Sequence, residues 1–195
     1  MELEHRYFLT LCKQKNMLID DFNTTLDIWL KELQNYNYKS LTQKQDASSW
    51  SIGQVYMHLI NETNWYFEQL ECCFSHTNNI EKEMAESAKF IFENNSFAAI
   101  KILGDPLISE HVPQPKNLDS IEKELLSLKS KAAKLWLRIN SDEPQGKTEH
   151  PGIEFLSPSE WLQYSEMHMR HHLKQKKRIV TYLNLNNITH IKKGL

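Results

Sequence analysis

Four stretches of the sequence place apolar residues alternately three and four positions apart, which is the spacing of one face of an α-helix. The stretches are 18–36, 51–74, 119–139 and 157–182, and the first helix could begin as early as Leu3. Each can bury one apolar stripe against its neighbours. Five glycines and six prolines are few for 195 residues, which disfavours a turn-rich all-β fold. The sequence therefore predicts an all-α protein in which residues 1–195 form a single domain.

The starts of three helices can be read from capping residues. In a capping box, the side chains of the cap and of the third residue after it each satisfy the other's free backbone N–H. Ser51 and Gln54 have this spacing, as do Ser157 and Glu160, with a proline at the first helical position of the latter helix. A similar signal near Asp119 predicts the start of the third helix.

The connection at 76–117 is long and contains two glycine or proline clusters, so it predicts an extended loop with a short helix at 81–92. Long crossovers occur in four-helix bundles when two successive helices run parallel. We therefore expect 76–117 to be a crossover between the second and third helices. The polar stretch at 35–46 and the segment at 142–156 are expected to be loops.

Charge and cysteine content exclude several classes of protein. A formal net charge of -2 gives no excess of positive charge for binding nucleic acid. No apolar run approaches the roughly 18 to 20 residues that a membrane span needs. Cys12, Cys72 and Cys73 are odd in number and follow no secretory signal, so we expect a cytoplasmic protein without disulfides. Cys72 and Cys73 could form a redox pair, although burial in the helix is the simpler explanation.

The fourth helix carries polar residues on its apolar stripe. His168, His172 and Gln175 fall in line with Trp161 and Ile179 at about 100° per residue. Burying an imidazole without a partner costs on the order of 1 to 3 kcal/mol. Two imidazoles one turn apart should therefore share something that satisfies both, and a metal ion does so.

Histidines at i and i+4 can both reach one ion at roughly 2.0 to 2.1 Å. A third ligand is expected from another inward face, and His58, on the flank of the second helix next to Leu59, qualifies. His171 is a rival ligand but lies away from the centre of the stripe. The alternative is that His168 and His172 are neutral core histidines bonded to tyrosine or glutamine, and the spacing by itself leaves both interpretations open.

Two motifs then add a resemblance to a known family. Residues 50–59 read W-S, six residues and H-L; residues 160–161 read E-W; and residues 168–175 read H-x-x-H-H-x-x-Q. These motifs resemble, in order, both halves of the pattern of the DinB-like family, and the resemblance spans roughly 17–185. His150-Pro151 is similar to an H-P element of many relatives, although the glycine and aromatic residues around it depart from the pattern.

The resemblance implies an up-down-down-up four-helix bundle with a divalent metal, usually zinc or nickel, held by His58, His168 and His172. Gln175 and Glu62 are candidates for orienting an imidazole, from their helical positions. Relatives include transferases and isomerases that use low-molecular-weight thiols. Three neutral imidazoles leave the charge of the ion uncompensated, which favours activation of a thiol or water.

We therefore expect a metal-dependent enzyme that transfers a low-molecular-weight thiol to an electrophilic small molecule. The alternatives are a metal-dependent hydrolase and a non-catalytic, metal-stabilised module that binds a partner or responds to stress. Substrate selection is expected to fall to the loops at 76–117 and 142–156. Trp65 and Trp136, read as outward-facing, suggest a homodimer.

Overall fold

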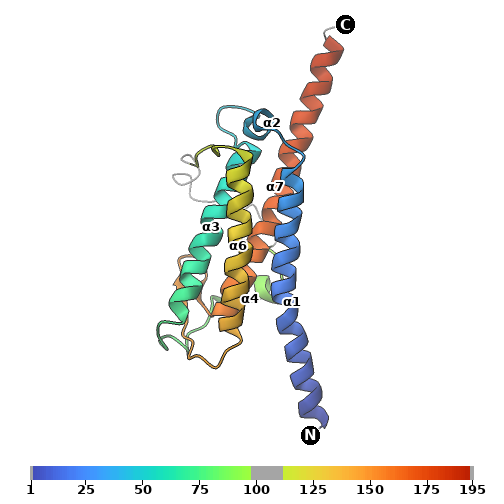
Figure 1. Ribbon diagram of the computed structural model, residues 1–195. Coiled ribbons are helices and arrows are strands. Elements are labelled where there is room, and N and C mark those ends of the chain that lie inside the picture. The colour runs from blue at the N-terminus through green and yellow to red at the C-terminus, as the bar shows by residue number, and fades with distance from the viewer. Residues whose placement is uncertain (1, 98–111, 194–195) are drawn as a thin grey trace.

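The computed structural model describes residues 2–97 and 112–193, with side chains for 17–97 and 112–184. Within these residues four long helices lie side by side (Figure 1), namely α1 (Glu2–Leu33), α3 (Ile52–Cys73), α6 (Leu118–Ile139) and α7 (Pro158–Lys193). The chain runs up α1, down α3, down α6 and up α7, so the expected up-down-down-up bundle is confirmed. The parallel course of α3 and α6 agrees with the crossover expected at 76–117, of which residues 98–111 lie outside the described part of the chain.

The starts of the helices follow largely from local capping. Ser51 and Gln54 form the expected capping box, in which the Gln54 N–H donates to Ser51 Oγ over 3.1 Å. At the start of α7 the backbone N–H of Ser157 donates to the carboxylate of Glu160 over 2.7 Å. The cap of α6 is Asn117, whose side chain accepts from the Ser120 N–H, so the start predicted near Asp119 is correct to within two residues but its cap was misassigned.

The core is one cluster to which all four long helices contribute. α3 and α7 share the most extensive contact, and both α3 and α1 also pack on α6. The largest fully buried side chains include the residues of the predicted stripes: Phe22, Leu26, Trp29, Tyr56, Leu59, Ile121, Leu125 and Trp161. Burial of these stripes is the main term that stabilises the bundle, at roughly 1.5 to 3 kcal/mol for each large apolar side chain.

A buried polar contact ties α1 to α7. Thr25 donates to the buried carboxylate of Glu166 over 2.7 Å, and Arg170 donates to both oxygens of the same carboxylate at 2.8 and 2.6 Å. A carboxylate with these partners is satisfied within the core, whereas an unpaired one would be strongly destabilising. The contact helps to fix which face of α7 packs on α1.

Short elements lie between the long helices, and two of them, α2 and a hairpin, occur where loops were expected. Within 35–46 the structure has α2 (Tyr38–Thr42), because Asn37 and Ser40 form a capping box and Leu41 is buried. The helix expected at 81–92 is α4 (Glu86–Glu93). Within 142–156 lies an antiparallel hairpin of β1 (Thr148–His150) and β2 (Glu154–Leu156), too short to leave an alternating pattern in the sequence.

Some side-chain expectations were wrong. Tyr182, the last residue of the apolar stripe predicted at 157–182, is 47% exposed, and Leu183, four positions after Ile179, packs on the core in its place. Trp65 and Trp136 are half-buried and pack against the core rather than facing outward. The homodimer inferred from these two tryptophans remains a prediction.

The cysteines that can be described are both unpaired. Cys73 is buried, and its thiol contacts the Thr148 hydroxyl and the Leu156 carbonyl oxygen, while Cys72 is exposed. Burial raises the pKa of the Cys73 thiol. Core packing therefore accounts for Cys73, and Cys12 lies outside the residues with described side chains. Among the helices described, none is long and apolar enough to cross a membrane.

Candidate metal centre

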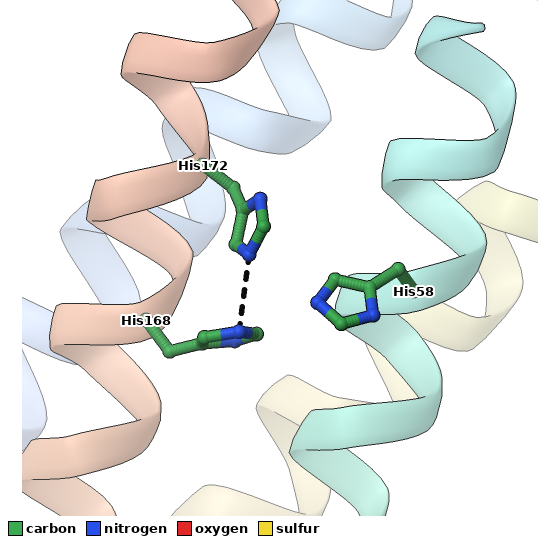
Figure 2. Close-up of side chains that lie close together, drawn as sticks. All are labelled: His58, His168 and His172. Carbon is green, nitrogen blue, oxygen red and sulfur yellow. Dashed lines mark hydrogen bonds between the residues drawn. The ribbon is translucent and has the colours of Figure 1, made fainter. Parts of the chain in front are cut away.

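The three histidines selected from the sequence meet at the interface between α3 and α7. His58 comes from the first half of α3, and His168 and His172 lie one turn apart on α7. Figure 2 shows the three imidazoles pointing towards one another across the gap between the two helices. One potential ligand atom from each lies within 4.8 Å of the other two. The structure therefore brings together all three predicted residues.

The spacing of the rings suits a shared ion. Nε2 of His168 and Nε2 of His172 are 3.1 Å apart, the contact drawn as a dashed line in Figure 2. Two nitrogens that each lie 2.0 to 2.1 Å from a tetrahedral ion are separated by about 3.3 Å. The ring of His58 lies 5.1 Å from that of His168 and 4.8 Å from that of His172, measured between centroids. Small side-chain adjustments would suffice for coordination.

All three imidazoles are neutral at neutral pH. Burial lowers the pKa of His58 to about 4 and that of His172 to about 3. The pKa of His168 is also well below its usual range, through burial first and then through His172 beside it. A histidine binds a metal only when its ring nitrogen is unprotonated, so these shifts favour coordination.

Gln175 determines which nitrogen of His172 faces the centre. Its Oε1 lies 2.5 Å from Nδ1 of His172, so Nδ1 carries the proton and Nε2 has its lone pair free. Nε2 of His168 must then supply the proton of the contact between the two rings. This leaves Nδ1 of His168 bare and buried, without a hydrogen-bond partner in the described part of the chain. An ion between the two rings would bind the Nε2 lone pairs of both, with the proton of the neutral His168 ring then on Nδ1, so the pair can serve a metal as two neutral ligands.

The other candidate residues have different surroundings. His171 is half-buried and faces Phe97, with 5.7 Å between ring centroids, and it is not part of the group within 4.8 Å. Glu62 is half-buried within hydrogen-bonding reach of the Tyr66 hydroxyl, and burial raises its pKa. No hydrogen bond joins Glu62 to an imidazole among the described residues. Gln175 therefore orients a histidine, whereas Glu62 does not.

Aromatic residues surround the centre, and their role could not be read from the sequence. The ring of Trp50 lies 5.0 Å from that of His58, and the ring of Tyr66 lies 5.5 Å from that of His168, at 90°. Trp50 belongs to the motif at 50–59 and Tyr66 to the apolar stretch at 51–74, but neither pattern places these rings beside the histidines. Their place beside the histidines follows from the packing of α3 on α7, which no local pattern reports.

Comparisons with known proteins identify a solved structure with a similar fold. Neither family models nor curated protein sequences give a match. A solved structure that matches is YfiT from Bacillus subtilis, described as a probable metal-dependent hydrolase with an unusual four-helix bundle topology. The similarity has a TM-score of 0.59 and covers 88% of this chain and 89% of YfiT, at 16% sequence identity. At this identity the similarity establishes the architecture rather than the activity. The chain therefore shares the four-helix-bundle fold of YfiT, with three histidines gathered between α3 and α7 where they could bind a metal ion.

Proposed function

We propose that the protein is a metal-dependent enzyme that transfers a low-molecular-weight thiol to an electrophilic small molecule. His58, His168 and His172 would hold the divalent ion. The observation that carries the proposal is that three neutral imidazoles, from two different helices, place a ligand atom each within 4.8 Å of one another. An imidazole cluster with only three protein ligands is the donor set of catalytic rather than structural zinc sites.

The identity of the ion follows from the chemistry of the ligands. Imidazole nitrogens are suited to zinc and nickel, whereas magnesium and calcium prefer oxygen ligands. No carboxylate belongs to the cluster among the described residues. We therefore expect zinc or nickel.

The residues of the chain would keep the centre positively charged and open on one side. A divalent ion supplies Lewis-acid chemistry, which lowers the pKa of a thiol or water that reaches it. Three neutral ligands add no negative charge, so the centre attracts an anionic nucleophile. Gln175 fixes the ring of His172 through Nδ1. In the described structure the two ring nitrogens of His58 make no hydrogen bond, and both are accessible to solvent. Small molecules would therefore approach the centre from the side of His58.

A second candidate is a metal-dependent hydrolase, in which water is the nucleophile. The description of YfiT as a probable metal-dependent hydrolase favours this alternative, and the same three histidines would serve it. The third candidate, a metal-stabilised module without turnover, uses the same site for stability alone.

The test has two stages. Elemental analysis of protein purified without a polyhistidine tag should find about one divalent ion per chain. Metal-loaded and metal-stripped protein are then assayed against electrophiles with several cellular thiols, and against esters and amides without thiol. We expect turnover that requires both metal and thiol. Metal-dependent hydrolysis without thiol would support the second candidate, and no metal-dependent turnover would support the third.

A further inference from the structure

A fourth imidazole, His150, lies in the same interface but outside the metal cluster. It ends β1, and its ring lies 4.9 Å from that of Tyr164, 5.5 Å from that of Trp161 and 6.1 Å from that of Trp65. The strand itself is anchored, because Thr148 accepts from the Trp161 indole N–H over 2.8 Å. The ring is therefore held between α3 and α7 by three aromatic neighbours.

One hydrogen bond fixes the tautomer of this ring. The backbone N–H of Gly152 donates to Nδ1 of His150 over 3.0 Å, so Nδ1 is unprotonated and the proton of the neutral ring is on Nε2. Burial lowers the pKa of His150 to about 4, which keeps the ring neutral at neutral pH. The outer nitrogen of His150 is thus a hydrogen-bond donor and not a base.

This donor is not used within the protein. Among the described residues none accepts a hydrogen bond from Nε2 of His150. This nitrogen is also absent from the fully buried atoms that lack a partner, so solvent can reach it. A donor that solvent can reach but that makes no bond within the protein is free to bind a ligand.

His150 is also close to the metal cluster. Tyr164, which touches His150, precedes His168 by one turn of α7. The ring of Tyr164 lies 5.2 Å from that of Tyr66, which in turn lies 5.5 Å from that of His168. Tyr66 is 3% exposed, whereas Tyr164 and His150 are half-buried, so a small molecule with its reactive end at the three histidines could reach His150 past the exposed side of Tyr164.

We propose that Nε2–H of His150 donates a hydrogen bond to an oxygen of the small molecule that reacts at the three histidines, and so selects substrates that carry a carbonyl or carboxylate there. The proposal about His150 rests on the proposed function, because it assumes that the reactive end of the small molecule lies at the metal centre. The loop around His150 then contributes a specificity-determining residue rather than only covering the bundle.

Two substitutions separate this role from a structural one. In H150N the side-chain oxygen can replace Nδ1 and keep the bond from Gly152, but no donor reaches the position of Nε2. In H150Q the amide nitrogen can reach the position of Nε2, while the bond from Gly152 is lost. A role in selecting ligands requires H150N to be the defective variant, whereas a purely structural role requires H150Q to be the defective one.

The binding probes are mercaptoacetate, 3-mercaptopropionate and 4-mercaptobutyrate, with ethanethiol as the probe without an oxygen. Their affinities for the cobalt(II)-loaded protein are measured from the thiol-to-cobalt absorption band. We expect at least one mercaptocarboxylate to bind wild type and H150Q about tenfold or more tightly than H150N, because a hydrogen bond to a charged group is lost. Ethanethiol should bind all three proteins equally. Equal affinities of every mercaptocarboxylate for wild type and H150N would overturn the inference.

A second readout does not depend on the metal. Nitrogen-15 NMR of the metal-free protein at neutral pH should show His150 with the proton on Nε2. A ring that is charged, or protonated on Nδ1, would overturn the inference and leave the proposed function standing. If wild-type protein with the expected tautomer binds neither cobalt nor any thiol, the proposed function fails and the inference fails with it.

Discussion

Acid should destabilise the metal-free protein through His58, and the size of the effect can be worked out. Burial lowers the pKa of His58 from about 6.5 in the unfolded chain to about 4 in the folded one. Between these values the unfolded chain binds more protons, so the free energy of unfolding falls as the pH falls. The contribution of the neutral His58 to the free energy of unfolding is fully present above pH 6.5 and is lost as the pH falls to 4.

The magnitude follows from the shift. At about 1.4 kcal/mol for each pH unit, a pKa that falls from about 6.5 to about 4 amounts to at most about 3.5 kcal/mol. Since natural domains are stabilised by only about 5 to 15 kcal/mol, a loss of 2 to 3 kcal/mol is readily measured.

The assay is urea unfolding at pH 6.5, 5 and 4 in the presence of a chelator, for wild type and H58Q. Glutamine is polar but does not titrate. Between pH 6.5 and 4 the free energy of unfolding of H58Q should therefore decrease by about 2 to 3 kcal/mol less than that of wild type. The control H76Q makes the same substitution outside the cluster, so that a general effect of replacing a histidine by glutamine can be recognised. Equal losses in wild type and H58Q would refute the argument that a neutral imidazole is buried at this position.

Three further predictions concern the metal. Replacing His58, His168 or His172 by alanine should each strip the ion while His171→Ala retains it, as measured by elemental analysis; undiminished metal in His172→Ala would contradict the assignment. Gln175→Leu should weaken metal binding about 10- to 100-fold, because the bond to Nδ1 of His172 is lost, and an unchanged dissociation constant would show that Gln175 does not position the ring. Metal affinity should fall as the pH drops from about 5 towards 3, because burial lowers the pKa of His58 to about 4 and that of His172 to about 3. For exposed imidazoles the fall would occur near pH 6.5. Titration with zinc or nickel at several pH values would test this, and constant affinity down to pH 3 would argue for other ligands.

Local interactions made much of this protein readable from its sequence. The capping boxes at Ser51 and Ser157 involve residues three positions apart, so they act in the same way in any context. The apolar stripes report a helical period directly, and His168 and His172 share a face because four residues complete about one turn. The same rules missed α2, because the residues of a capping box at Asn37 are also those of loops.

Contacts between distant segments were decided only by the tertiary structure. The meeting of His58 with His168, 110 positions later, depends on how α3 packs on α7. The sequence indicated it only indirectly, through the inward face on which His58 lies and a resemblance to known motifs. The half-buried position of Trp65 and the enclosure of His150 by aromatic rings depend on the same packing. Helical periodicity determines which side of a helix is apolar, but which residues of two helices meet depends on the fit of their side chains across the interface.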